Sequence, residues 1–230
     1  MGPHQSAEDV EQEHLRVFGP RLGPLYHALE NEVIWLHAKW LEYRKLYARS
    51  EQRVDLLNKS AGFFFRVVQD VLWADLLLHV TRLTDPPKQG QYENLTLLRL
   101  RDAVNDKVLA KGIRKLISDA LAKAEFAREW RNRHLAHREL SLAAEATARP
   151  LPGASRQSVE DVLATFREIM NRLHAHFLQA EVGFEHFLAC DDAEALVHHL
   201  AVAARYEERQ RERFEQGRLL PEDLEPPPEA

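Results

Sequence analysis

Apolar residues recur at spacings of three and four along most of the chain, which is the period of a helix with one buried face. The clearest stripe predicts a helix over Pro24–Ala48 and consists of Leu25, Leu29, Val33, Leu36, Trp40, Tyr43 and Tyr47. A second long helix is predicted over Glu51–Thr84, with a bend near Ser60-Ala61-Gly62. Its part from Phe63 to Leu83 is apolar almost all round, so we expect it to be the central, most buried helix. Asp85-Pro86-Pro87 ends it, because proline cannot continue a helix.

Capping residues and apolar periodicity place the remaining helices. The first helix is Ser6–Phe18, which Ser6 caps and Gly19-Pro20 ends. A short helix runs from Asn94 or Thr96 to Val104, and a long helix runs from Asp106 to His137, with Gly112 as a candidate kink. The last two helices run from the capping box Ser158–Asp161 to Phe177 and from Asp191 to Phe214. Lys88–Glu93 is expected to be a polar loop. No segment alternates as a strand does, so the predicted fold class is all-α, a single-domain bundle of about five to seven helices.

The domain organisation follows from these elements. Residues 1–22 are assigned to an N-terminal extension with a short helix, and residues 23–216 to the all-α domain. Residues 217–230 form a tail rich in proline and acidic residues, which we expect to be disordered because it has little apolar surface to bury.

The net charge of the chain and its distribution exclude one class of protein but do not identify an activity. The 230 residues carry a net charge of −5, which argues against a general nucleic-acid coat protein with a broadly basic surface. Residues 99–138 nevertheless hold 11 lysines and arginines against 5 acidic residues, a balance of +6 that leaves −11 for the rest of the chain. This asymmetry suits an anionic ligand, although a solvated charged face would look the same.

The setting itself is predicted to be the cytoplasm. The one cysteine, Cys190, excludes an intramolecular disulfide. No apolar run approaches the roughly 18–20 residues needed to span a bilayer, and the N-terminus lacks the apolar core of a secretory signal.

The candidate functional residues cluster in Phe126–Arg138, which reads FAREWRNRHLAHR. An apolar helical seam precedes this motif, and the same spacing then presents His134 and His137 where apolar residues stood upstream. Ionisable residues on the inward side of a helix require an explanation. One is purely structural, because arginine and histidine near a helix C-terminus interact favourably with the helix dipole and cap its last carbonyls.

Metal binding is a weaker interpretation of these histidines. His134 and His137 share one helix face, but no neighbouring carboxylate completes a zinc motif. Two more histidine pairs, at positions 174 and 176 and at positions 198 and 199, can join a site only through the fold. We therefore predict no metal site and no cofactor.

The segment Arg131-Asn132-x-x-x-x-His137 resembles the Arg-polar-x(n)-His signature of the HEPN superfamily, all-α proteins common in prokaryotic toxin–antitoxin and antiviral systems. More specifically, the chain is similar to the HEPN family associated with abortive infection of the U type. The similarity is carried by EWRNRHLAHREL, by FFFRVVQDVLWADLLLHVTRLTDPPK and by ENLTLLRL, and it covers about Glu30–Glu139. The Arg–His pattern alone is short, and its combination with LTDPP makes the resemblance specific.

Many HEPN proteins are metal-independent endoribonucleases that act as homodimers with the motif at the dimer interface. The resemblance therefore implies Arg131 and His137 as a catalytic pair, with Asn132 as the polar residue that positions them. The neighbouring candidates for substrate binding are Arg128, Arg133, His134 and Arg138. It also implies RNA as the substrate, with transfer RNA as one candidate, and an antitoxin as a candidate partner. Some HEPN toxins carry a modifiable tyrosine two residues after the motif histidine, but this chain has Glu139 there, so that route of neutralisation is not expected.

These side chains suit RNA cleavage without a metal. A histidine with a pKa of about 6.5 can remove the proton of a 2′-hydroxyl or supply one to the leaving oxygen, while a guanidinium holds the phosphate. The products would be a 2′,3′-cyclic phosphate and a 5′-hydroxyl. Arg131 and His137 are about 9 Å apart along a straight helix and about 120° apart around it, so either the helix ends between them or a second copy completes the site. Arg133, four residues before His137, is the alternative phosphate contact.

Two other functions are compatible with the same residues. One is a non-catalytic HEPN-like module that binds RNA or nucleotide, or only dimerises around the motif. The other is a toxin component that a partner holds inactive.

Overall fold

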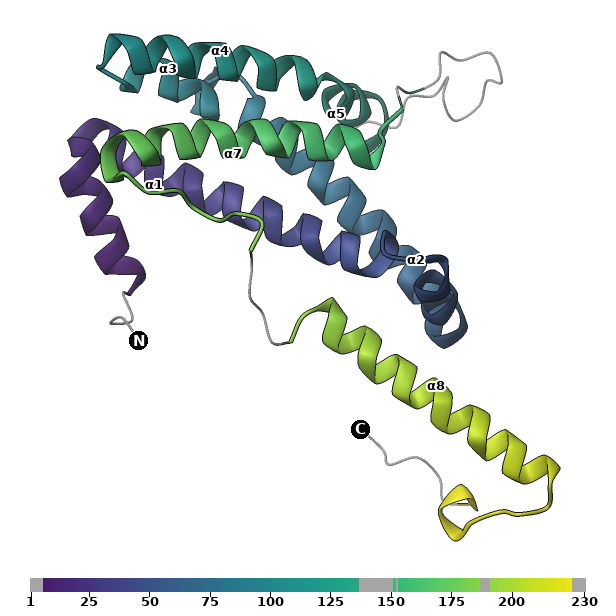
Figure 1. The fold of residues 1–230 in the computed structure, drawn as a ribbon. Coiled ribbons are helices and arrows are strands. Elements are labelled where there is room, and N and C mark those ends of the chain that lie inside the picture. Colours follow the sequence, from purple (N-terminus) through teal and green to yellow (C-terminus); the bar gives the residue numbers. More distant parts are fainter. Residues whose placement is uncertain (1–5, 137–150, 152, 187–190, 225–230) are drawn as a thin grey trace. The chain divides into compact units, whose positions relative to one another are not determined.

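The computed structural model describes residues 6–136, 151, 153–186 and 191–224, and this part of the chain is almost wholly helical. The α-helices are α1 (Ala7–Tyr47), α2 (Glu51–Thr84), α3 (Leu100–Ala103), α4 (Lys107–Lys123), α5 (Glu125–Trp130), α7 (Arg156–Leu178) and α8 (Ala193–Glu215) (Figure 1). Two 3-10 helices, η1 (Leu97–Arg99) and η3 (Pro221–Leu224), and a π-helix, η2 (Arg131–Leu135), accompany them. The predicted all-α class is confirmed.

The chain forms two compact units, one of Met1–Trp40 with Leu72–Phe187 and one of Leu41–Val71 with Leu188–Ala230. The motif belongs to the first unit, in which α4 and α7 lie side by side (Figure 1). Fully buried residues of this unit include Leu29, Leu36, Leu76, Leu77, Ile113, Ile117 and Phe166. These residues come from α1, α2, α4 and α7, so four helices contribute to the core beside which the motif lies.

The two long helices bend where their sequences predict a break. Gly19 in α1 has φ 83° and ψ 171°, a backbone conformation that favours glycine, and Pro20 follows it. Ala61 in α2 has φ −161° and ψ 65°, within the predicted bend. The expectation that α2 is buried throughout from Phe63 to Leu83 is wrong for its first half, where Phe63, Phe64, Val67 and Val71 are exposed.

Several local predictions differ from the structure. The long motif helix is not continuous, because Ala124 separates α4 from α5, and Gly112 lies within regular helix. Helix α7 is capped by Ser155, whose hydroxyl accepts from the amide of Ser158 at 3.0 Å, so the helix begins before the predicted capping box. The predicted loop after α2 contains a short hairpin of β1 (Lys88–Gln89) and β2 (Tyr92–Glu93).

The helix η3, which lies within the predicted tail, contacts α8. In η3, the carboxylate of Asp223 accepts from Nε of Arg213 at 2.8 Å, and its carbonyl accepts from Gln210 at 3.0 Å. These residues form a 3-10 helix within the segment 217–230, and the expected disorder of that segment stays a prediction. Among the helices that the structure describes, none is long and apolar enough to cross a membrane.

Candidate functional site

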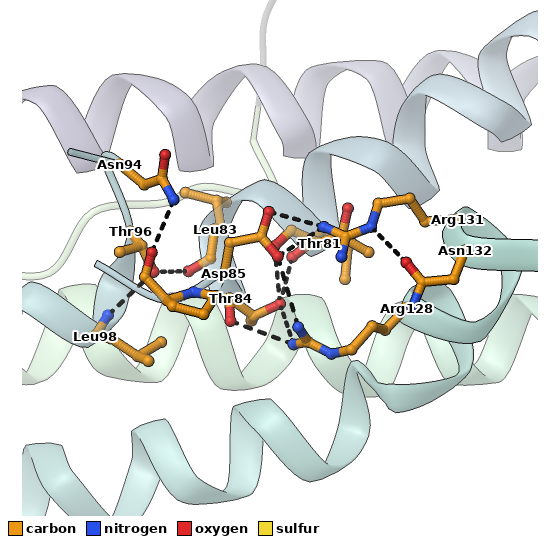
Figure 2. Close-up of polar contacts among 12 residues, drawn as sticks. Thr81, Leu83, Thr84, Asp85, Asn94, Thr96, Leu98, Arg128, Arg131 and Asn132 are labelled. Atoms are coloured by element: carbon orange, nitrogen blue, oxygen red, sulfur yellow. Dashed lines mark hydrogen bonds and ion pairs between the residues drawn. The ribbon is translucent and has the colours of Figure 1, made fainter. Parts of the chain in front are cut away.

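The candidate site lies at the C-terminal end of α2. The segment that follows the β1–β2 hairpin holds this end in place. The hydroxyl of Thr96 donates to the carbonyl of Leu83 at 2.9 Å and accepts from the amide of Leu98 at 3.4 Å (Figure 2). The last carbonyls of a helix have no partner within the helix, so this hydrogen bond satisfies one of them. It also fixes the backbone just before Asp85.

Asp85 lies between two arginines of the motif (Figure 2). Nη1 of Arg131 is 2.7 and 2.8 Å from the two carboxylate oxygens, and Nη1 of Arg128 is 3.5 Å from one of them. The side chains of Asp85, Arg128 and Arg131 are 14%, 22% and 26% exposed, so water screens their charges only in part. The carboxylate therefore orients the Arg131 guanidinium relative to α2.

Arg128 makes further contacts with α2. Its Nη2 donates to the carbonyl of Thr84 at 3.2 Å and to the Thr84 hydroxyl at 3.3 Å, and its Nε lies 3.6 Å from Glu125. The hydroxyl in turn donates to the carbonyl of Val80 at 2.9 Å. Arg128 was predicted to bind substrate, and the structure gives its guanidinium partners within the protein on every nitrogen.

Asn132 and Arg131 form a two-residue unit. Its side-chain oxygen accepts from Nε of Arg131 at 3.1 Å, and the asparagine is exposed. Among the described residues, Nη2 is the one nitrogen of this guanidinium without a hydrogen-bond partner. This nitrogen and the exposed amide of Asn132 are donors that an anionic ligand can use.

The structure places the other predicted residues as follows. His134 is exposed and meets the edge of the Trp130 ring, with 5.5 Å between ring centroids. Arg133 is half-buried. His137 and Arg138 lie outside the described residues, so their positions in the site stay predictions.

The backbone of the motif is a π-helix and not the predicted α-helix. The amide of Ala136 donates to the carbonyl of Arg131 at 2.8 Å, five residues back. Short π segments are rare and occur frequently at functional sites. The π-helix ends at Leu135, so the helix ends between Arg131 and His137, which is one of the two arrangements that their spacing left open.

A cleft of about 270 Å³ is lined in part by Asp85. Its ionisable lining consists of the carboxylates of Glu32, Asp85 and Glu93 and the guanidinium of Arg82. Each of these carboxylates has a basic partner: Asp85 pairs with the motif arginines, Glu93 with Arg99 and Glu32 with His79. The donors that suit an anion are those of Arg131 and Asn132.

A comparison with protein families identifies the family of this chain. A family model described as AbiU2, of the HEPN type, matches residues 20–196, which include both the end of α2 and the motif. The chain belongs to the HEPN family AbiU2. It is thus an abortive-infection HEPN-type protein. Comparison with curated proteins and with solved structures gives no significant match.

The residues that orient the motif of this HEPN protein were not predicted from its sequence. Asp85 was expected only to end a helix, and Thr84 only to be the last residue of that helix. The available signal was that LTDPP and the Arg131 motif occur together in the family resemblance. The structure gives the physical reason, because the two segments are joined by an ion pair across 46 positions of sequence.

Proposed function

We propose that this HEPN protein is a metal-independent endoribonuclease of antiviral defence or a toxin–antitoxin system. The observation that supports the proposal is the Arg131–Asn132 unit, in which Asp85 orients a guanidinium and leaves donors for a phosphate. The catalytic histidine of the family signature, His137, follows directly after the described end of the motif. Membership of AbiU2 supports the biological setting.

The proposed reaction needs three groups of the motif. His137 removes the proton of a 2′-hydroxyl, the bond from O2′ to phosphorus forms, and the bond from phosphorus to O5′ breaks. The leaving O5′ takes up a proton, which gives a 2′,3′-cyclic phosphate and a 5′-hydroxyl. Arg131 donates to a non-bridging oxygen and stabilises the charge that grows there, while Asn132 positions the guanidinium. Arg133 and His134 support the binding of the RNA backbone.

The proposed substrate, oligomeric state, partner and location follow from the resemblance to HEPN ribonucleases. The substrate is RNA, with transfer RNA as one candidate, and two copies of the chain form a homodimer with their motifs at the interface. An antitoxin restrains the activity, and the protein acts in the cytoplasm.

The first experiment is cleavage of labelled total RNA and transfer RNA by the purified protein in EDTA. The wild type should give fragments that end in a cyclic phosphate, and His137→Ala should give none. His198→Ala, which removes an exposed histidine of α8, is the matched control and should cleave like the wild type. Cleavage by His137→Ala would remove the catalytic assignment. Cleavage that requires added metal, although circular dichroism shows that the protein in EDTA is folded, would remove the mechanism.

Subunit mixing tests the homodimer with shared motifs. If Arg131 of one copy works with His137 of the other, the inactive variants Arg131→Ala and His137→Ala should regain about one quarter of the wild-type activity when mixed. Half of the randomly paired dimers are then mixed dimers, and each holds one intact site of two. No recovery on mixing, with exchange of subunits confirmed, would place both residues of a site in one copy.

A non-catalytic binding module is the second candidate, and the ion pair with Asp85 favours it. An arginine bound to a carboxylate of its own chain has a structural role that needs no reaction. RNA binding without cleavage, lost in Arg131→Ala, would support this candidate over the enzyme. Cleavage that appears only after a partner is removed would instead identify a restrained toxin.

A further inference from the structure

Two histidines and a glutamate meet in the first unit, at residues that are separate from the motif. His14 and Glu30 are buried, and His27 is half-buried. Each can offer one ligand atom such that the three atoms lie within 4.8 Å of one another. None of the three was singled out from the sequence, because His14 and His27 are 13 positions apart and lie on either side of a helix break.

The fold of α1 brings these residues together. The break at Gly19 divides the helix into two arms, and Gly23 lets the arms approach closely. A Cβ atom at Gly23 would lie 2.7 Å from the carbonyl oxygen of His14 and 2.7 Å from Cα of Leu15, which is too close for any side chain. The contact that glycine permits therefore sets His14 of the first arm against His27 and Glu30 of the second.

The distance between the two histidine nitrogens matches that of two ligands on a shared ion. Nδ1 of His14 is 3.3 Å from Nδ1 of His27, whereas hydrogen bonds from a nitrogen donor are usually about 2.9–3.0 Å long. Two nitrogens bound to one tetrahedral zinc ion, each at about 2.0–2.1 Å, are about 3.3–3.4 Å apart. Oε2 of Glu30 lies 3.7 Å from Nε2, the other ring nitrogen of His14, so this distance does not describe an ion held by Nδ1. The three residues do meet within 4.8 Å when each offers one ligand atom.

Neighbouring side chains orient two of the candidate ligands. The hydroxyl of Tyr26 donates to Oε1 of Glu30 at 2.9 Å, so that Oε2 faces His14. The side-chain nitrogen of Asn31 lies 3.2 Å from Nε2 of His27, so that Nδ1 faces His14. A turn of the Asn31 amide by 180° would bring its oxygen to Nε2 to accept from it, which is the contact that a metal-binding histidine usually makes through its second ring nitrogen.

The charge at Glu30 points the same way. Its carboxylate is buried, and among the described residues its ion-pair partners are the histidines His14 and His174, at 3.7 and 3.8 Å, and no lysine or arginine. A buried carboxylate without a cation is costly, and a divalent ion would offset that cost. Asn31 is exposed beside the half-buried His27, which gives an ion a route from solvent.

We propose that His14, His27 and Glu30 bind one divalent transition-metal ion, with zinc as the best match. Two imidazoles and a carboxylate are a ligand set that proteins use for zinc, with the fourth position open to water. Bound there, the ion links the two arms of α1 and stabilises the first unit. The proposal goes beyond the RNA cleavage proposed above and does not depend on it.

Cobalt binding to the full-length protein without an affinity tag tests the site. After dialysis against a chelator, the protein should take up one equivalent of Co²⁺ with the visible absorption of a tetrahedral site, and one equivalent of Zn²⁺ should displace it. Zn²⁺ should also raise the midpoint of thermal unfolding. His27→Gln and Glu30→Gln should each weaken Co²⁺ binding by at least about tenfold, while His198→Gln on α8 should bind like the wild type.

The two variants in the proposed site are chosen because each is expected to fold without the metal. Glu30→Gln preserves the size of the side chain and its contact with Tyr26, and it removes the buried charge, so the metal-free variant is expected to fold; far-UV circular dichroism checks this. His27→Gln changes only a half-buried position. Absence of the cobalt absorption in the wild type, or equal binding in both folded variants, would overturn the proposal. His137→Ala should still bind cobalt, so loss of RNA cleavage and loss of the metal site are distinguishable.

Discussion

Replacing Asp85 by asparagine tests whether its carboxylate holds the two motif arginines. The substitution keeps the size of the side chain and leaves the guanidiniums of Arg128 and Arg131 without their shared anion. Opposite unit charges about 4 Å apart attract by about 4 kcal/mol at an effective dielectric constant of about 20, and lost hydration offsets part of this. Because all three side chains are mostly but not fully buried, we expect the free energy of unfolding to fall by about 2 kcal/mol.

Urea unfolding followed by circular dichroism measures this loss as a lower midpoint with an unchanged slope. The matched control is Asp70→Asn. Asp70 accepts from Arg66 at 3.1 Å in the same type of ion pair, but the two side chains are 61% and 71% exposed. The control should therefore lose less than about 0.5 kcal/mol.

A double-mutant cycle isolates the ion pair from other effects of the substitution. Arg131→Gln alone, Asp85→Asn alone and the two together should give a coupling free energy of more than about 1 kcal/mol. A coupling below about 0.5 kcal/mol would refute the reasoning, because the pair would then be no stronger than an exposed one. RNA cleavage by Asp85→Asn should fall under conditions in which the variant is folded, since the guanidinium loses its orientation.

Three further changes test the fold. Burial lowers the pKa of His37 and of His79 to about 4, whereas an unfolded histidine titrates near 6.5, so the unfolded chain binds more protons between these values. The free energy of unfolding should therefore fall as the pH is lowered from about 6.5 to about 4, by up to about 3 kcal/mol per histidine. Urea midpoints that stay constant over this pH range would contradict this prediction. Gly23→Ala should lose at least about 2 kcal/mol through its clash with backbone, whereas Gly112→Ala, with nothing within 4 Å of its new Cβ, should gain up to about 1 kcal/mol. Asp106→Ala should lose about 1 kcal/mol because it removes the N-cap of α4, and Asp106→Asn should restore most of it.

Breaks that depend on local chemistry could be predicted from the sequence. Gly19-Pro20, Asp85-Pro86-Pro87 and the cap at Asp106 act through their own backbone, and the structure confirms all three. The break at Ala124 could not be predicted in this way, because alanine favours helix and neither glycine nor proline stands there. The start of α7 was misplaced because Ser155 and Ser158 are both good caps, and only the packing of the helix decides between them.

The candidate site was predictable to the same extent. Arg131 and Asn132 are adjacent in sequence, and a hydrogen bond joins their side chains. Asp85 reaches Arg131 across 46 positions, and no local pattern indicates which carboxylate will do so. The π-helix was also unpredictable, since its sequence has the spacing of an ordinary α-helix. Tertiary structure, and not propensity, sets both features.

The position of Asp85 explains why the two segments of the family resemblance belong together. A carboxylate directly after the C-terminus of a helix meets the negative end of the helix dipole, which is unfavourable by about 0.3–1 kcal/mol. The two prolines that follow Asp85 prevent the helix from continuing and so keep the carboxylate at this end. Arg128 and Arg131 reverse the local charge balance, because one anion is shared by two cations. Glu125, 3.6 Å from Nε of Arg128, supplies a second negative charge, so the four side chains are balanced within the protein and the ion pair stabilises the junction of α2 with the motif.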